Sequence, residues 1–223
     1  MRQTSINIVQ LAVALLIMTV LIALVLPMFG SPRINSRHMQ NSTQLRGIHQ
    51  GLVTFANSNK NWFPGINPDG TTLDLRIEYR YQILLEGDYI TPDYAINPSE
   101  TELIMEWDEW ADDSKPVTKT NYSYAMLQIP EDEHGRRSEW AQTLNSQAIV
   151  LSDRNTGTKD KPASIHSDQG EAWQGSVLWN DNHVQFEHSD VFETKYGSGQ
   201  LNLKDQLFES NGLFDAFMIN SAN

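Results

Sequence analysis

The chain opens with an uncharged apolar segment that any fold has to accommodate. From Ile6 to Phe29 no residue carries a charge, and residues 11–26 are almost all aliphatic. In a helix that rises 1.5 Å per residue, about 20 such residues span the hydrocarbon core of a bilayer, which is about 30 Å thick. We therefore predict a transmembrane helix over residues 6–29. Its membrane-packing surface is expected to contain Leu11, Leu15, Val20, Leu24 and Pro27.

Two alternative interpretations explain this segment less well. The apolar region of a cleavable secretory signal usually has about 7–15 residues and ends in a small-x-small site. The present run is longer and ends in Leu26-Pro27-Met28-Phe29-Gly30, which does not fit such a site. A helix buried in the core of a soluble protein, the second alternative, rarely lacks a polar face over this length.

The charges that flank the segment leave its orientation open. Arg2 precedes it, whereas Arg33, Arg37 and Arg46 follow it. A positive-inside count alone would place the rest of the chain in the cytoplasm, but long domains translocate largely regardless of charge.

Composition limits what the remainder of the chain can do. With 223 residues, the protein has room for one domain with a core in addition to the apolar segment. A net charge of −12 argues against nucleic acid as a partner, because phosphate binding requires clustered lysine and arginine. The absence of cysteine excludes disulfides, thiolate catalysis and zinc sites with cysteine ligands.

A second helical pattern follows the apolar segment. Leu45, Ile48, Leu52 and Phe55 are spaced 3, 4 and 3 residues apart, which is one stripe of an amphipathic helix. We expect this helix to run from about residue 34 to 57 as a continuation of the first, with a proline-induced bend between the two. The polar residues between the stripe positions are expected to face water: Gln44, Arg46, His49, Gln50 and Asn57.

The rest of the chain is predicted to form a small α+β domain. Residues 79–85 predict a second helix. The alternating residues 122–126 predict a strand, and the apolar run 148–151 predicts a buried strand that is central in a sheet. Residues 177–179 and 183–186 predict a hairpin whose turn, Asn180 to Asn182, contains residues that tolerate positive φ. The expected fold class is therefore α+β, with a long N-terminal helix, transmembrane in its first half, packed on a small antiparallel β-sheet.

Several of these segments resemble the type IV pilin and pseudopilin family. Residues 6–17 and the ending Leu26-Pro27 are similar to its prepilin-type N-terminal helix, and Asn61-Trp62-Phe63-Pro64 is similar to the exit from that helix in relatives of the major pseudopilin of type II secretion. His166, followed by residues 176–186, resembles the family's C-terminal signature of a histidine, a strand and Asp-Gly. The chain is thus similar to pilin-like proteins at both ends.

The resemblance implies a structural role without enzymatic activity. It implies a subunit of a type II secretion or type IV pilus-like assembly, with the membrane and other pilin-like subunits, or copies of itself, as partners. It places the protein in the cell inner membrane as a single-pass protein with its C-terminal domain outside the cytoplasm. The implied layout is a leader-like segment at 1–5, a transmembrane helix at 6–29, an amphipathic continuation at 30–58 and an extracytoplasmic domain at 59–223.

The chain departs from the family pattern at the positions that govern processing. The family's junction, where the leader is cleaved and the new N-terminus is methylated, corresponds to Ser5 and Ile6, and Ser5 stands where the family has glycine. Gln10 replaces the glutamate that pairs with the N-terminal amine of a neighbouring subunit. These departures favour an alternative function, a membrane-tethered extracytoplasmic binding module that does not assemble.

Candidate site residues gather in the C-terminal half. His166, Asp181 and His183 are candidate ligands of a divalent ion, and His166 with Asp153 and a serine could imitate a hydrolase triad. No Gly-x-Ser-x-Gly or His-Glu-x-x-His motif supports either site, so we expect Asp181 to shape a turn and the histidines to bond loop backbone.

An acidic stretch over residues 100–113 is the other place where a cation could bind. It lacks the spacing of an EF-hand loop, so a solvated face is expected there. Trp107 and Trp110 within this stretch are expected in the core. Related major pseudopilins bind calcium, so the resemblance keeps calcium as a cofactor candidate but identifies no ligand residue.

Overall fold

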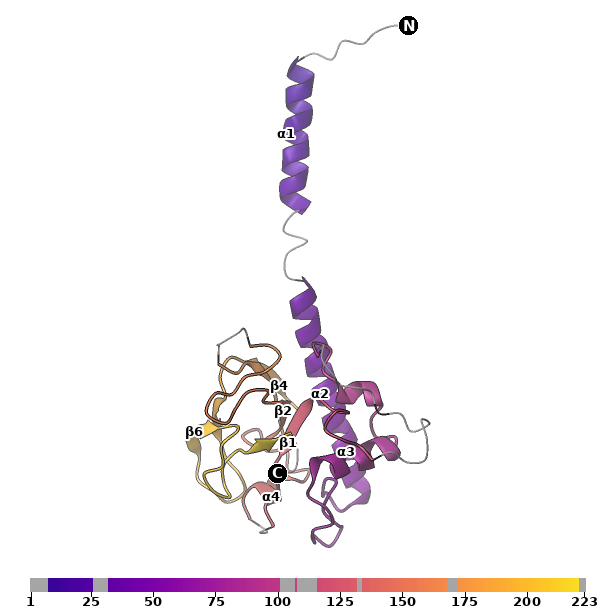
Figure 1. Ribbon diagram of the computed structural model, residues 1–223, viewed down its shortest axis with the longest axis vertical. Helices are drawn as coiled ribbons and strands as arrows, with labels where there is room; N and C mark the ends of the chain where they lie inside the picture. The colour runs from indigo at the N-terminus through magenta and orange to yellow at the C-terminus, as the bar shows by residue number, and fades with distance from the viewer. Residues whose placement is uncertain are drawn as a thin grey trace. The chain divides into compact units, whose positions relative to one another are not determined.

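A computed structural model describes residues 8–25, 32–100, 107, 116–131, 134–167 and 172–220. The chain divides into two compact units, Met1–Arg37 and His38–Asn223. The first contains the apolar helix α1, and the second contains the α+β domain (Figure 1).

Helix α1 runs from Ile8 to Val25 and consists almost entirely of aliphatic residues. Within the described residues, no helix is both long enough and apolar enough to cross a membrane. The predicted long N-terminal transmembrane helix is therefore wrong. The 18 described residues of α1 extend about 27 Å, less than the hydrocarbon core of about 30 Å.

Helix α2 extends from Pro32 to Ser58, close to the predicted amphipathic segment. Three of the four residues of its apolar stripe, Leu45, Ile48 and Leu52, are fully buried, and Phe55 is half-buried. Arg46, Gln50 and Asn57 face solvent as expected. Gln44 and His49 do not, since both are buried against other parts of the domain. The buried surface of α2 is thus wider than the stripe that its apolar residues define.

Two further helices and a short 3-10 helix complete the helical part of the described chain. Helix α3, Ile77–Glu86, confirms the predicted second helix and buries Ile77, Tyr81 and Leu84 on one face. The 3-10 helix η2, Pro92–Ala95, follows it, and the single-turn helix α4 covers Arg136–Glu139.

The main sheet has five antiparallel strands in the order β4-β3-β2-β1-β7. The strands are β1 (Tyr124–Leu127), β2 (Ile149–Asp153), β3 (Gly175–Trp179), β4 (Val184–Glu187) and β7 (Met218–Ile219). β2 is central and fully buried, as predicted. β1 was expected to alternate, but all four of its residues are buried, because α2 and α3 supply a second covered face.

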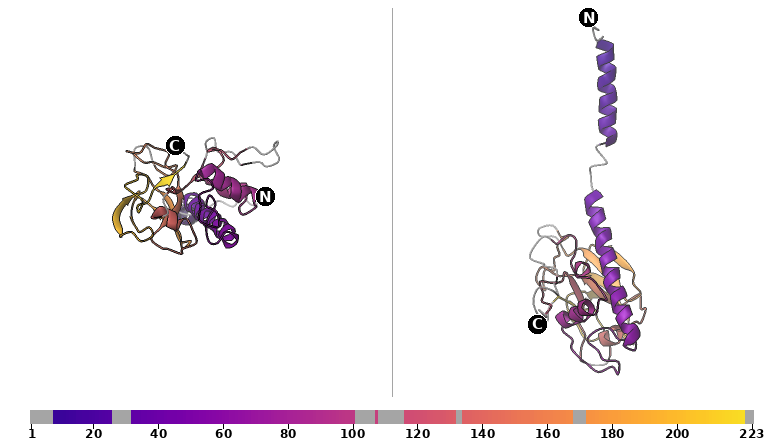
Figure 2. Two further views of the ribbon diagram at one scale, coloured as in Figure 1. Left: turned by 90° about the horizontal axis from the view of Figure 1, so that it is seen from below. Right: turned by 90° about the vertical axis from the view of Figure 1, so that its right-hand side faces the viewer.

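The predicted hairpin forms between β3 and β4. Leu178 pairs with Val184, and the turn residue Asn182 has a φ of 69°, which asparagine tolerates better than most residues. A separate ribbon pairs β5 (Val191–Thr194) with β6 (Asn202–Gln206). Within this unit, α2 and α3 lie on one side and the ribbon on the opposite side (Figure 1, Figure 2).

A buried arginine joins α3 to β1. Arg80 is fully buried, and its guanidinium donates to the carbonyls of Leu127 at 2.8 Å and Leu75 at 2.9 Å. Its Cζ lies 4.7 Å from the ring centroid of Trp140. Burial lowers the pKa of Arg80 to about 9, so the group remains charged at neutral pH. Backbone carbonyls and an aromatic ring thus take the place of water around this cation.

Truncation of one stripe residue tests the packing of α2. Leu52→Ala is expected to lower the free energy of unfolding by about 2–5 kcal/mol, since it removes a fully buried side chain and leaves a cavity. Urea unfolding of the full-length chain, followed by tryptophan fluorescence, measures the change. The exposed Arg46→Ala on the same helix is the control and should stay within about 0.5 kcal/mol of wild type. Equal losses in the two variants would contradict the packing described.

Candidate functional site

The apolar surface of α1 is the largest candidate interaction surface. Leu11, Leu15 and Val20, three of the predicted packing residues, are 54%, 56% and 53% exposed. Other exposed aliphatic residues surround the helix: Ile8, Val9, Val13, Leu16, Ile17, Met18, Leu21 and Ile22. Contiguous apolar surface of this extent marks a site that another apolar surface covers.

A hydroxyl in the middle of α1 does not interrupt this surface. Thr19 Oγ1 donates within the helix to the carbonyls of Leu15 at 2.8 Å and Leu16 at 2.9 Å. The Thr19 hydroxyl therefore bonds to the backbone of its own helix and needs no hydrogen-bond acceptor from a partner.

The predicted processing and packing residues are only partly described. Gln10 lies on α1 and is exposed. Ser5, Ile6 and Pro27 lie outside the described residues, as does the side chain of Leu24. Cleavage and methylation at Ser5 and Ile6 therefore stay predictions.

A buried carboxylate forms the centre of a second candidate site, in the α+β domain. Asp153, the last residue of β2, is 1% exposed. It accepts hydrogen bonds from Asn97 Nδ2 at 2.6 Å, from the backbone N of Ser176 at 2.6 Å and from Asn41 Nδ2 at 3.0 Å. His166 Nε2 lies 3.4 Å from Oδ2. Donors from α2, β3 and two loops thus replace the water that an exposed carboxylate would bind.

A hydrogen-bonded chain connects this carboxylate to the exposed side of the domain. The single hydroxyl proton of Tyr124 on β1 is shared between two acceptors, Asn41 Oδ1 at 2.7 Å and Gln44 Oε1 at 2.9 Å. Gln44 in turn donates to the carbonyl of Asp93 at 2.8 Å. Burial, followed by the charge of Asp153, raises the pKa of Tyr124 well above its ordinary value, so its hydroxyl remains a donor. These bonds account for the burial of Gln44, which was predicted to face water.

Three histidines surround one phenylalanine next to Asp153. His38 stacks on Phe186 with ring centroids 4.2 Å apart, and His166 meets the same ring edge-on at 5.5 Å. His188 contacts it from β4's end at 5.3 Å. Burial, and then the neighbouring His166, lower the pKa of His38. The cluster therefore favours neutral imidazole at this position.

The arrangement around His166 does not form a hydrolase triad. Its Nε2 faces Asp153 and, at 3.4 Å, Asn97, and within the described chain no serine hydroxyl bonds its ring. Ser176 Oγ instead accepts from Asn41 at 3.0 Å. A triad requires a base whose second nitrogen reaches the nucleophile. The chemistry that this arrangement supports is structural hydrogen bonding.

The other two predicted metal ligands lie at the β3–β4 turn. Asp181 accepts from the backbone N of His183 at 3.2 Å and also contacts its Nδ1, so Asp181 shapes the turn as expected. The His183 ring stacks on Trp179 with centroids 4.2 Å apart. His166 is held instead by Asp153, not by loop backbone. Among the residues with described positions, no group of three or more histidine, aspartate or glutamate side chains could hold a metal ion.

His49 on α2 occupies a second buried position, under the same turn. Asn180 donates to the carbonyls of Glu139 at 2.6 Å and Ala141 at 3.0 Å, which turns its Oδ1 away from them. That oxygen, Asn182 Oδ1 and both His49 nitrogens lie buried, with no well-aligned partner in the described part of the chain. Burial lowers the pKa of His49 to about 4, and the oxygens of the two asparagines oppose this shift only partly.

Most residues of the buried site could not be singled out in the sequence. Polar residues on a helix are ordinarily expected to face solvent, as would be the case for Asn41, Gln44 and His49. Asn97 lies in a loop. One signal was present: Asn41 and Gln44 lie seven and four residues before Ile48, so they continue its buried stripe toward the start of the helix. Trp107 is buried as predicted, whereas Trp110 and most of the acidic stretch lie outside the described residues.

Comparison with known proteins identifies no relative. No protein-family model matches the chain, and no curated protein or solved structure matches it.

Removal of the central carboxylate tests the buried site. Asp153→Ala is expected to lower the free energy of unfolding by about 3–5 kcal/mol, because it leaves Asn41, Asn97 and the Ser176 amide without their acceptor. Urea unfolding at neutral pH measures it. The exposed Asp160→Ala is the matched control and is expected to remain within about 0.5 kcal/mol of wild type. An Asp153→Ala protein as stable as wild type would show that the carboxylate holds nothing in place.

The depressed pKa of His49 predicts a loss of stability in acid. The folded protein keeps this imidazole neutral to about pH 4, whereas the unfolded chain binds the proton near pH 6.5. The neutral group therefore stabilises the fold above pH 6.5, and this contribution is lost as the pH falls toward 4. The difference in the pKa of His49 between the folded and unfolded states corresponds to about 3 kcal/mol in the free energy of unfolding.

His49→Gln isolates this contribution, because glutamine keeps a neutral polar group that does not titrate. The difference in unfolding free energy between wild type and variant should change by about 3 kcal/mol between neutral pH and about pH 4. Denaturant titrations at a series of pH values measure it. His134→Gln removes an exposed imidazole and serves as the control. A pH-independent difference for His49→Gln would refute the assignment.

Proposed function

We propose that the chain is a pseudopilin-like structural subunit, not an enzyme, that assembles through α1 in a type II secretion or type IV pilus-like assembly. The observation that carries the proposal is the all-round apolar surface of α1, whose aliphatic side chains are about half exposed or more wherever their exposure is described. Burial of each such side chain is worth about 1.5–3 kcal/mol. A helix with this surface gains its stability from apolar neighbours rather than from water.

Copies of the same helix supply the neighbours that this proposal requires. α1 offers aliphatic side chains in every direction, so one helix contacts several others at once, as a bundle or fibre demands. The α+β domain, with its own core, is then displayed by the assembly. Partners are other copies of the chain or other pilin-like subunits.

A location at the cell inner membrane, with the α+β domain extracytoplasmic, is part of the proposal. It rests on the resemblance at residues 6–17 and on the apolar surface of α1, not on a membrane-spanning helix. No cofactor is required for this role.

Single-cysteine cross-linking tests the proposed assembly. The chain contains no cysteine, so any disulfide-linked dimer reports the position of the introduced thiol. Cysteine is placed singly at Leu15, Leu16, Ile17 and Met18, which point about 100° apart and together sample all sides of the helix. Oxidation of the full-length chain in cells is expected to yield dimers at more than one of these positions.

Leu144→Cys is the matched control, because Leu144 lies on the α+β domain and is 65% exposed, compared with 66% for Leu16. It is expected to give no dimer above background. If none of the four α1 positions cross-links while the protein is recovered with membranes, the tethered module that does not assemble is favoured. Equal cross-linking at Leu144 and in α1 would indicate non-specific collision.

A further inference from the structure

The loop that connects β6 to β7 contains two exposed neighbours, Asn211 and Gly212. They form the only Asn-Gly pair in the chain. Because glycine has no Cβ, its backbone nitrogen is less obstructed than that of any other residue. The side-chain amide of Asn211 is therefore next to an accessible nucleophile. The proposed assembly through α1 makes no use of this loop.

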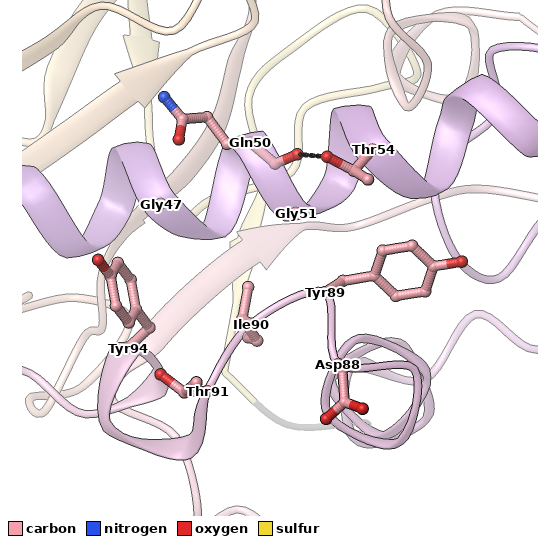
Figure 3. A pocket seen from close by; sticks show the side chains of 9 residues that line it. All are labelled: Gly47, Gln50, Gly51, Thr54, Asp88, Tyr89, Ile90, Thr91 and Tyr94. Carbon is pink, nitrogen blue, oxygen red and sulfur yellow. Dashed lines mark hydrogen bonds between the residues drawn. The ribbon is translucent and has the colours of Figure 1, made fainter.

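The surroundings of Gly212 leave its backbone nitrogen open. Gly47 and Gly51 of α2 show the usual covered state: a Cβ on Gly47 would overlap the ring of Tyr94, and one on Gly51 would lie 2.7 Å from Ile90 Cγ2 (Figure 3). A Cβ on Gly212 would instead have no described heavy atom within 4 Å, apart from its chain neighbours. The Gly212 N–H also donates no hydrogen bond to a described residue.

The side-chain amide of Asn211, the other reacting group, is unbonded within the described part of the chain, where only the backbone N of this residue is bonded. Asn145, which precedes a serine, shows the opposite state. Its Nδ2 donates to the carbonyl of Lys195 at 3.0 Å, and its Oδ1 accepts from the backbone N of Gln147 at 2.9 Å. These bonds hold the Asn145 side chain in place, whereas that of Asn211 is able to turn toward the nitrogen that follows it.

We infer that Asn211 is a site of spontaneous deamidation. The Gly212 nitrogen attacks Asn211 Cγ and forms a C–N bond, while the side-chain nitrogen leaves as ammonia with the proton that the Gly212 nitrogen loses. The product is a cyclic imide. Water then opens one of the two C–N bonds of the ring, which gives either aspartate or isoaspartate. The rate rises with pH, because the attacking nitrogen must lose its proton.

The modification changes a loop that the domain holds at three points. The backbone N of Asn211 donates to the Asp215 carboxylate. Arg136 donates through Nη1 to the carbonyl of Gly212 and through its backbone N to that of Leu213, both at 2.7 Å. Isoaspartate adds a carbon to the main chain between these points, and aspartate adds a negative charge close to that of Asp215. Both products therefore loosen the loop that leads into β7.

Peptide mapping of the full-length chain after incubation in mildly alkaline buffer tests the inference. Mass spectrometry measures the conversion of each asparagine, and electron-transfer fragmentation distinguishes isoaspartate from aspartate. Conversion at Asn211 is expected to be about tenfold faster or more than at Asn145, which corresponds to a barrier lower by about 1.4 kcal/mol. Conversion at Asn145 that is as fast as at Asn211 would overturn the inference.

The same incubation in guanidinium chloride separates the contribution of the fold from that of the sequence. Asn145 is expected to react faster when unfolded, because its two bonds are lost, whereas the rate at Asn211 should stay within about tenfold of that in the folded chain. A larger acceleration at Asn211 would show that the bonds of the loop protect it, and would overturn the inference.

Asn211→Gln is the matched variant, because the longer side chain forms the corresponding ring much more slowly. It is expected to remain unmodified at position 211, and Asn145→Gln should leave conversion at Asn211 unchanged. After equal incubation, wild type should unfold at a lower guanidinium concentration than Asn211→Gln, although the two start with the same midpoint. Equal midpoints after full conversion of Asn211 would contradict the loosening of the loop.

Discussion

The Asp153 carboxylate is the interaction on which the α+β domain depends. A charge removed from water to this extent requires several donors, and here they come from α2, from β3 and from the loop after η2. Each hydrogen bond to Asp153 also holds the donating residue in position. The carboxylate therefore sets the position of a helix that packs on the sheet as well as the alignment of two central strands.

The two helices at the N-terminal end differ in the surfaces that they present. α2 is packed into the domain from Asn41 onward through both apolar and polar contacts. α1 is apolar on every side, and all of its large aliphatic side chains whose exposure is described are exposed. The predicted junction between the two helices, residues 26–31, lies outside the described residues.

Much of the domain could be predicted from local pattern. α3, β2 and the β3–β4 hairpin follow from apolar spacing and from turn residues, because each is determined by neighbours in the chain. The burial of Gln44 and His49 could not be predicted, since it depends on Tyr124 and Asn180, which are more than 75 residues away in sequence. Asp181 was correctly predicted to shape the turn before His183, but His166 belongs to a different cluster, around Asp153.

The buried guanidinium of Arg80 has a consequence for how the domain opens. Its partners are carbonyls at Leu75 and Leu127, on different elements, and the ring of Trp140. If β1 separated from α3, the Arg80 guanidinium would lose the carbonyl of Leu127 while it stayed buried. No carboxylate would replace that interaction. Partial opening at this junction is therefore more unfavourable than complete unfolding, in which water surrounds the group again. Backbone amides near Arg80 are expected to exchange hydrogen only when the whole domain unfolds.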